Sequence, residues 1–187
     1  MTDFMQRLDG AMPTVQKWIE GLHRRHQSSA VAAHDTGFSR LSEHYPVELL
    51  RATRAVAVDT IPFPPVSLLG LPEFEEMASM DMAGITFLDM YFFRPDASSE
   101  GLHFHELVHV VQWNALGLRP FLLTYALGIV QYGYVASPLE AKAYELQNQF
   151  ESGKLRSFVV KEIEAHAVVA RSAAEGIFRQ YGIEMGA

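Results

Sequence analysis

The 187-residue chain contains no cysteine, and this absence excludes disulfide bonds and thiolate metal ligands. Any metal site must therefore be built from histidine, aspartate or glutamate side chains. The lack of cysteine also fits a reducing compartment. The first residues show no basic start followed by an apolar run and a small-residue cleavage site, as a secretory signal would. We therefore expect a cytoplasmic protein.

Positive charge is scarce as well. The chain has 15 Lys and Arg residues against 22 Asp and Glu residues, giving a formal net charge of −7, and no Lys/Arg-rich run interrupts this balance. We therefore expect no nucleic-acid partner, because such partners are held by clustered positive charge. With 49% hydrophobic and 20% charged residues, the composition is typical of a globular chain whose length suits one domain.

Long charge-free runs are absent with one exception, residues 120–139, which read PFLLTYALGIVQYGYVASPL. Twenty such residues are about enough to cross a bilayer. Thr124, Gln131, two glycines, three tyrosines and a proline at each end argue against a membrane span. We expect a buried core helix here and no transmembrane span, while peripheral contact with a membrane stays open.

Hydrophobic spacing and turn residues predict a mostly helical chain with a little strand. We expect helices at 12–33, 46–53, 100–116 and 120–132, another from Ser137-Pro138, and a long one after Gly153. Strand signals occur near 54–58, before a proline-rich loop at 61–72, and at 85–93, where ITFLDMYFF is rich in β-branched and aromatic residues. The pattern predicts an α+β fold with a small sheet preceding the 100–116 helix.

The whole chain, 1–187, is expected to form one domain with three parts. These are a helical N-terminal extension (1–45), a core that carries the site (46–152) and a long C-terminal helix (153–187).

The strongest chemical signal is HFHELVHVVQW at residues 103–113. Residues four apart on a helix lie about 40° from each other around the axis, so His105 and His109 can hold one ion. Glu106 is rotated by about 100° from His105, which places a base beside the ion rather than on it. The helix is otherwise apolar nearly all round, and ionisable groups inside it need a partner such as a metal. The pattern predicts Zn²⁺ on the two histidines and Glu106 as the catalytic base.

A catalytic zinc site needs a third protein ligand. The candidates are Glu140, Glu145 and Asp89, since His103 stands two residues before His105 and faces away from the pair. Glu140 begins a helix one helical hairpin later, and Glu145 lies about 140° around that helix from it, so only one of the two can face the site. We favour Glu140.

The position of Glu140 has a second interpretation, because Ser137-x-x-Glu140 is also the pattern of a capping box, in which the glutamate bonds only the cap backbone N–H. Tyr144 and Gln147 share the Glu140 face of that helix, and Gln112 continues the histidine face of the first. We expect Gln112 and Tyr144 to support the ligands or stabilise the reaction.

Taken together, these residues resemble the zincin metallopeptidases, in the gluzincin branch whose third ligand is a downstream glutamate. More narrowly, AGITFLDMYFF followed by LHFHELVHVVQW is similar to small bacterial domains in which a strand and a short loop precede an HELTHVVQ-type helix. The resemblance covers about residues 50–150. It implies a zincin-like domain in which zinc is held by His105, His109 and Glu140 and water is activated by Glu106.

The resemblance further implies a zinc-dependent peptidase acting on a peptide or protein substrate. An extended peptide would pair with an edge strand at 85–93 through main-chain hydrogen bonds. One feature departs from the family pattern: thermolysin-like members brace a histidine with an aspartate four residues after the glutamate ligand, where this chain has Tyr144. A Tyr or His also stabilises the oxyanion in such enzymes, and the candidates here are Tyr125, Tyr132, Tyr134 and Tyr144.

Two other functions compete with a peptidase. A di-iron helical protein would use two Glu-x-x-His pairs, and Glu106–His109 and Glu20–His23 both match that spacing. A non-catalytic module with the zincin fold would bind a partner or peptide without cleaving it. Three histidines of the N-terminal segment could form a second metal site, but we expect them to be surface groups: His23, His26 and His34.

Overall fold

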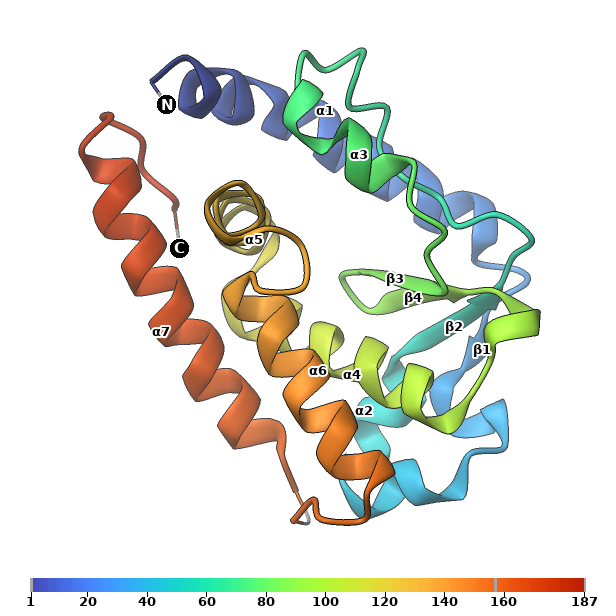
Figure 1. Cartoon of the computed structure of the whole chain (residues 1–187). Helices are drawn as coiled ribbons and strands as arrows, with labels where there is room; N and C mark the ends of the chain where they lie inside the picture. The colour runs from blue at the N-terminus through green and yellow to red at the C-terminus, as the bar shows by residue number, and fades with distance from the viewer. Residues whose placement is uncertain (1, 157, 187) are drawn as a thin grey trace.

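Helices surround a small sheet in this chain (Figure 1), and 63% of the residues are helical, which confirms the predicted α+β class. The computed structural model describes residues 2–156 and 158–186. The α-helices are α1 (Thr2–His26), α2 (Val47–Ala52), α3 (Glu75–Ala78), α4 (Glu100–Leu116), α5 (Leu118–Tyr132), α6 (Pro138–Glu151) and α7 (Val160–Arg179). The strands are β1 (Val31–Ala32), β2 (Arg54–Ala57), β3 (Gly84–Phe87) and β4 (Met90–Phe93). Short 3₁₀ helices occur at η1 (Ala33–Thr36), η2 (Ser39–Glu43), η3 (Pro72–Phe74) and η4 (Pro95–Ala97).

The strands form one mixed sheet in the order β1-β2-β4-β3. The pair β2/β4 is parallel, and the two outer pairs are antiparallel. Residues 85–93, predicted as a single strand, form a hairpin instead, with Leu88 at a left-handed φ of 60° in the turn. The hairpin buries Phe87, Met90 and Phe92 and leaves Asp89 exposed at the turn, whereas one continuous strand would have carried that charge through the middle of the sheet.

Strand β3 lies at an edge of the sheet, as expected of a surface that could bind an extended peptide. It is short, and two of its carbonyls are already bonded by side chains. The indole N–H of Trp113 donates to the Thr86 carbonyl at 3.2 Å, and His23 Nε2 donates to the Phe87 carbonyl at 2.8 Å. Less backbone is therefore free for pairing than the sequence predicted.

Helix α4 is the centre of the structure. Thirteen of its 17 residues are buried, because its apolar residues lie on all sides of the axis. It packs against α6 and α7 on one side and against β3 on another (Figure 1). The Ser99 hydroxyl accepts from the Leu102 backbone N–H at 3.1 Å and caps the helix, which ends at Gly117, where φ is 77°.

The charge-free run 120–139 forms most of α5, the turn at Gly133 and the beginning of α6. Phe121, Leu123 and Leu127 are buried in the core, as a core helix requires. Among residues 2–156 and 158–186, no helix combines the length and apolar character needed to cross a membrane.

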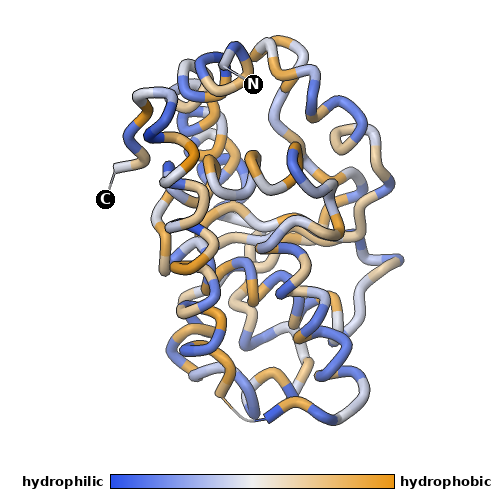
Figure 2. The backbone as a smooth tube through the Cα atoms, turned by 60° about the vertical axis from the view of Figure 1, so that its left-hand side comes forward, coloured by the Kyte–Doolittle hydropathy of each residue, from blue (hydrophilic) through white to orange (hydrophobic). Residues whose placement is uncertain are grey.

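The two ends of the chain differ in detail from the prediction. Helix α1 runs from Thr2 to His26 rather than over 12–33, and Pro13 lies inside it. It ends before Val31 because that residue pairs with Ala55 of β2. The C-terminal helix begins at Val160 rather than directly after Gly153. Hydrophobic and hydrophilic residues alternate along the helices (Figure 2), and the beginning of α1 lies at the same end of the molecule as the end of α7 (Figure 1).

Candidate metal centre

His105, His109 and Glu140 converge on one point. Each offers one ligand atom, and the three atoms lie within 4.8 Å of one another. The two histidine Nε2 atoms are 3.1 Å apart, and they lie 3.4 Å and 3.3 Å from the Glu140 carboxylate oxygens. In the described part of the chain, this is the one group of three or more His, Asp or Glu side chains placed to hold a metal ion.

Two packed helices bring this group together. The histidines stand four residues apart on α4, and Glu140 lies in the first turn of α6, which packs against α4. No capping box forms, because the Ser137 side chain makes no cap hydrogen bond and its hydroxyl is buried without a partner. The Glu140 carboxylate is turned towards the histidines instead.

The other ligand candidates lie elsewhere. Glu145 pairs with Lys142 at 3.2 Å and is more than half exposed. Asp89 sits in the β3–β4 turn, 3.7 Å from His23. His103 faces away from the pair, as expected, and its ring nitrogens bond the hydroxyls of Tyr91 and Ser98 at 2.7 Å and 3.1 Å.

Two glutamines fix the orientation of the histidine rings. His105 Nδ1 donates to Gln147 Oε1 at 3.0 Å, and His109 Nδ1 donates to Gln112 Oε1 at 2.9 Å. Both Nε2 atoms are thereby left facing Glu140. These neutral amides stand where the resemblance implies a carboxylate brace. The ring of Tyr144 packs on His105 with centroids 4.7 Å apart, and thus supports this ligand by contact rather than by a hydrogen bond.

Glu106 lies beside the three converging side chains. Its Oε2 accepts from the Thr86 hydroxyl of β3 at 2.7 Å, and the residue is only 3% exposed. Gly84 makes room for it, since a Cβ at that position would come within 2.5 Å of Glu106 Oε1. Burial raises the pKa of the Glu106 carboxyl, and the nearby histidines offset part of this effect.

His109 and Glu140 form a buried charge pair. Burial lowers the pKa of His109, but the Glu140 carboxylate, together with Glu106 and Gln112, outweighs burial and raises the pKa to about 9. Burial likewise raises the pKa of Glu140, yet the two histidines bring it well below its usual range. Each group thus favours the charged form of the other.

This donor set fits zinc. Glu140 Oε2 is buried without a hydrogen-bond partner, beside two imidazoles whose Nδ1 atoms are already bonded. Two imidazole nitrogens and one carboxylate oxygen are a ligand set that zinc uses in catalytic sites, and bonded Nδ1 atoms are usual for histidines that bind metal. An ion would also satisfy the unpartnered oxygen.

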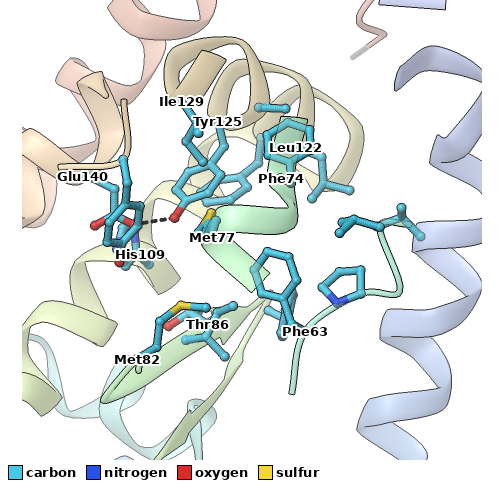
Figure 3. A pocket seen from close by; sticks show the side chains of 18 of the residues that line it. Phe63, Phe74, Met77, Met82, Thr86, His109, Leu122, Tyr125, Ile129 and Glu140 are labelled. Carbon is cyan, nitrogen blue, oxygen red and sulfur yellow. Dashed lines mark hydrogen bonds and ion pairs between the residues drawn. The ribbon is translucent and has the colours of Figure 1, made fainter. Parts of the chain in front are cut away.

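The four tyrosine candidates now separate. Tyr125 donates to Glu140 Oε1, and burial raises its pKa well above the usual range, so the proton stays on the hydroxyl. Tyr134 lines the same cavity as Glu106 and Glu140, while Tyr132 is 59% exposed. Figure 3 shows Tyr125 pointing towards Glu140 and His109 at one end of this cavity.

The N-terminal residues considered for other metal sites do not join the group. Glu20 is exposed and accepts from Gln16, and His23 bonds the Phe87 carbonyl. His26 packs its ring against Phe92, and His34 pairs with the neighbouring Asp35. The Glu20-x-x-His23 pair therefore does not face His109. Comparison of the chain with family models, curated proteins and solved structures gave no match.

Proposed function

We propose that the protein is a zinc-dependent hydrolase that cleaves peptide bonds, with Zn²⁺ held by His105, His109 and Glu140. The observation that carries this proposal is the convergence of these three ligand atoms next to a fourth ionisable group, Glu106. Glu106 stands on α4 with the two histidines, and its carboxylate accepts a hydrogen bond from Thr86. A structural zinc site would need no such additional carboxylate beside its ligands.

Zinc in this position would polarise the substrate carbonyl and lower the pKa of a water molecule. Glu106 takes the proton from the attacking water and passes it to the leaving amine nitrogen as the C–N bond breaks, and burial makes its carboxylate a stronger base by raising the pKa. Thr86 fixes the carboxylate by its hydrogen bond. Tyr125 holds Glu140, while Gln112 and Gln147 hold the two histidines.

Tyr134 is the residue we assign to stabilise the oxyanion. The hydroxyl of Tyr125 is already engaged by Glu140, Tyr144 packs on His105, and Tyr132 is exposed. Tyr134 lines the cavity with Glu106. The free backbone of β3 next to Gly84 would bind the substrate main chain.

The test pairs zinc content with turnover in Glu106→Gln. The amide keeps the shape of the side chain but cannot take a proton, so we expect one zinc per chain and a loss of peptide hydrolysis of about 10²–10⁴-fold. Metal content is measured by mass spectrometry, and hydrolysis with labelled casein and a quenched fluorescent peptide library. Glu164→Gln, an exposed position on α7, is the matched control and should change neither.

Loss of zinc together with activity would make Glu106 a ligand. Undiminished turnover would assign the activity to another site. The occupied carbonyls of β3 favour one alternative, a zincin-like module that binds zinc without cleaving peptides, and one zinc without any turnover in the unmodified protein would support it. Two irons per chain would support a di-iron site. We place the protein in the cytoplasm.

A further inference from the structure

One end of a cavity of about 110 Å³ is formed by the proposed zinc ligands His105, His109 and Glu140 (Figure 3). Its walls come from α1, the proline-rich loop, α3, β3, α4 and α5, so it reaches beyond the helices that carry the ligands. Apolar side chains on these walls include Met12, Phe63, Phe74, Met77, Leu122 and Ile129.

The lining is divided by polarity. Its polar side chains are Thr86, Glu106, Tyr125 and Tyr134 together with the three converging residues His105, His109 and Glu140. All other lining residues are apolar, and no lysine, arginine or aspartate lines the described cavity. A charged group placed among these walls would be left unpaired, at high cost. An apolar group would gain by leaving water.

The size of the cavity limits what can enter. A cavity of about 150 Å³ lined by apolar side chains holds one benzene molecule. At about 110 Å³ this cavity is smaller than that one, so a single aromatic ring or branched aliphatic group would fill it completely. It is too small for a long acyl chain, which argues for an amino-acid side chain.

The wall opposite the ligands is fixed in place. Arg7 of α1 bonds the carbonyl of Gly70 and pairs with Glu73, which ties the proline-rich loop and η3 to the helix. The rings of Phe4 and Phe74 pack 6.1 Å apart at the same junction. The cavity therefore has defined walls on both sides.

We propose that this cavity is a specificity pocket that takes one large apolar side chain of the substrate, of the phenylalanine, leucine or methionine class, adjacent to the bond that is cut. The assignment to a peptide rests on the proposed function. The walls contributed by α1 and the proline-rich loop select this side chain, while the metal-binding end receives the peptide carbonyl.

The pocket can be tested without metal or turnover. Methionine methyl groups are labelled with ¹³C in the metal-free protein, which is titrated with toluene as an analogue of the phenylalanine side chain. Met12, Met77 and Met82 line the cavity, whereas Met90 and Met185 are buried elsewhere. We expect saturable shifts of the first three signals and none of the other two.

A filling variant localises the binding. Ile129→Trp places an indole ring in the cavity and should weaken toluene binding by at least about tenfold, or 1.4 kcal/mol. Ile177→Trp is the matched control, since Ile177 packs against the same core cluster without lining the cavity, and it should bind toluene normally. Leu122→Phe replaces the filling variant if Ile129→Trp fails to fold.

The assignment of a specificity pocket would be overturned by any of three results. These are no shift with toluene, a stronger response to 1-decanol at the same methionines, and unchanged toluene binding in the folded filling variant. These outcomes are separate from the fate of the proposed function. Toluene binding in a protein that never cleaves peptides would retain the pocket and reject the peptidase, and peptide cleavage without toluene binding would do the reverse.

Discussion

Neutral glutamine side chains, rather than carboxylates, orient the two histidines of the candidate site. Gln147 accepts from His105 and Gln112 accepts from His109, and each glutamine amide group donates onward, to Glu151 and to the Leu139 carbonyl. Each ring is thus held through a chain of two hydrogen bonds that leads to a residue of α6. Hydrogen-bond partners of this kind orient metal ligands, and their loss measurably lowers metal affinity or activity.

Removing one of these glutamines should weaken zinc binding. In Gln147→Ala the His105 ring loses its Nδ1 partner, and we expect zinc affinity to fall by about 10–100-fold. Competition with a chromophoric chelator measures this affinity. Gln149→Ala, two residues further along α6, removes only a contact to Glu145 and should leave the affinity unchanged. Equal affinities in both variants would show that Gln147 does not hold the ligand.

Gly84 should be intolerant of a side chain for a reason that involves Glu106. A Cβ there would lie 2.5 Å from Glu106 Oε1 and 3.2 Å from the Phe92 carbonyl, so Gly84→Ala must displace the Glu106 carboxylate, the proposed base. We expect turnover to fall by about 10²-fold, the usual cost of a misplaced catalytic group, while zinc content stays at one per chain. Gly176→Ala in α7, where a Cβ meets nothing within 4 Å, should retain full activity. Normal turnover in Gly84→Ala would remove Glu106 from the reaction.

Zinc uptake should depend on pH through His109. Its pKa of about 9 lies above the usual 6.5, so the ring carries a proton at neutral pH that must leave before Nε2 can bind a metal. The apparent affinity should rise by about tenfold per pH unit up to pH 9 and then level off, for one proton released. The sign for the metal-free protein is opposite. The raised pKa stabilises the fold fully below pH 6.5, and this stabilisation is lost between pH 6.5 and 9.

Affinities from pH 6.5 to 9.5 in chelator-buffered zinc, with thermal melts of the metal-free protein, check both parts of this prediction. A flat affinity profile would contradict it.

At the residue scale, the sequence indicates in which direction side chains on a helix point, but not which side chains they contact. Helical periodicity alone orients His105, Glu106 and His109 relative to one another, and it separates Glu140 from Glu145. The space that Gly84 leaves for Glu106 could not be foreseen, because it depends on how β3 packs against α4. The bond from Gln147 to His105 depends in the same way on the packing of α6 against α4.

At the scale of elements, α4 must be both buried and correctly placed, and its N-terminal cap contributes to this. Ser99→Ala removes the hydroxyl that accepts from the Leu102 backbone N–H, and we expect the free energy of unfolding to fall by about 1 kcal/mol. Denaturant titration measures it. Ser172→Ala, at an exposed position within α7, should stay within about 0.5 kcal/mol of the unmodified protein. Equal stability of both variants would mean that Ser99 contributes no cap.

The errors in the predicted elements have tertiary causes. The run ITFLDMYFF carries strand propensity throughout, and only the pairing of Phe87 with Met90 across a two-residue turn divides it. Helix α1 stops at His26 because Val31 and Ala32 pair with β2, a contact that spacing along the chain does not reveal. Helix α4, in contrast, was predicted over 100–116 as found, since a serine cap and a terminal glycine mark its ends.

On the scale of the whole molecule, the first 45 residues are part of the structure that surrounds the site. Strand β1 extends the sheet, and Leu8, Met12 and Val15 of α1 line the cavity beside the candidate metal centre. Nothing in the sequence connects α1 with the site, because the apolar face of this helix could have packed on any part of the core. Its removal should therefore alter substrate selection as well as stability.

The three proposed ligands stand on two different helices, and in a chain without cysteine this would give a bound metal a second effect. An ion bound by His105 on α4 and Glu140 on α6 would crosslink the polypeptide and close a loop of roughly 35 residues, as a disulfide would. For a loop of that length, the restriction of the unfolded chain is worth about 3–4 kcal/mol. If the ion is lost on unfolding, its binding free energy stabilises the folded state directly. Either way, a chelator should lower the melting temperature by roughly 10 °C in a domain of this size, and a melt unaffected by chelation would show that α4 and α6 are not joined by metal.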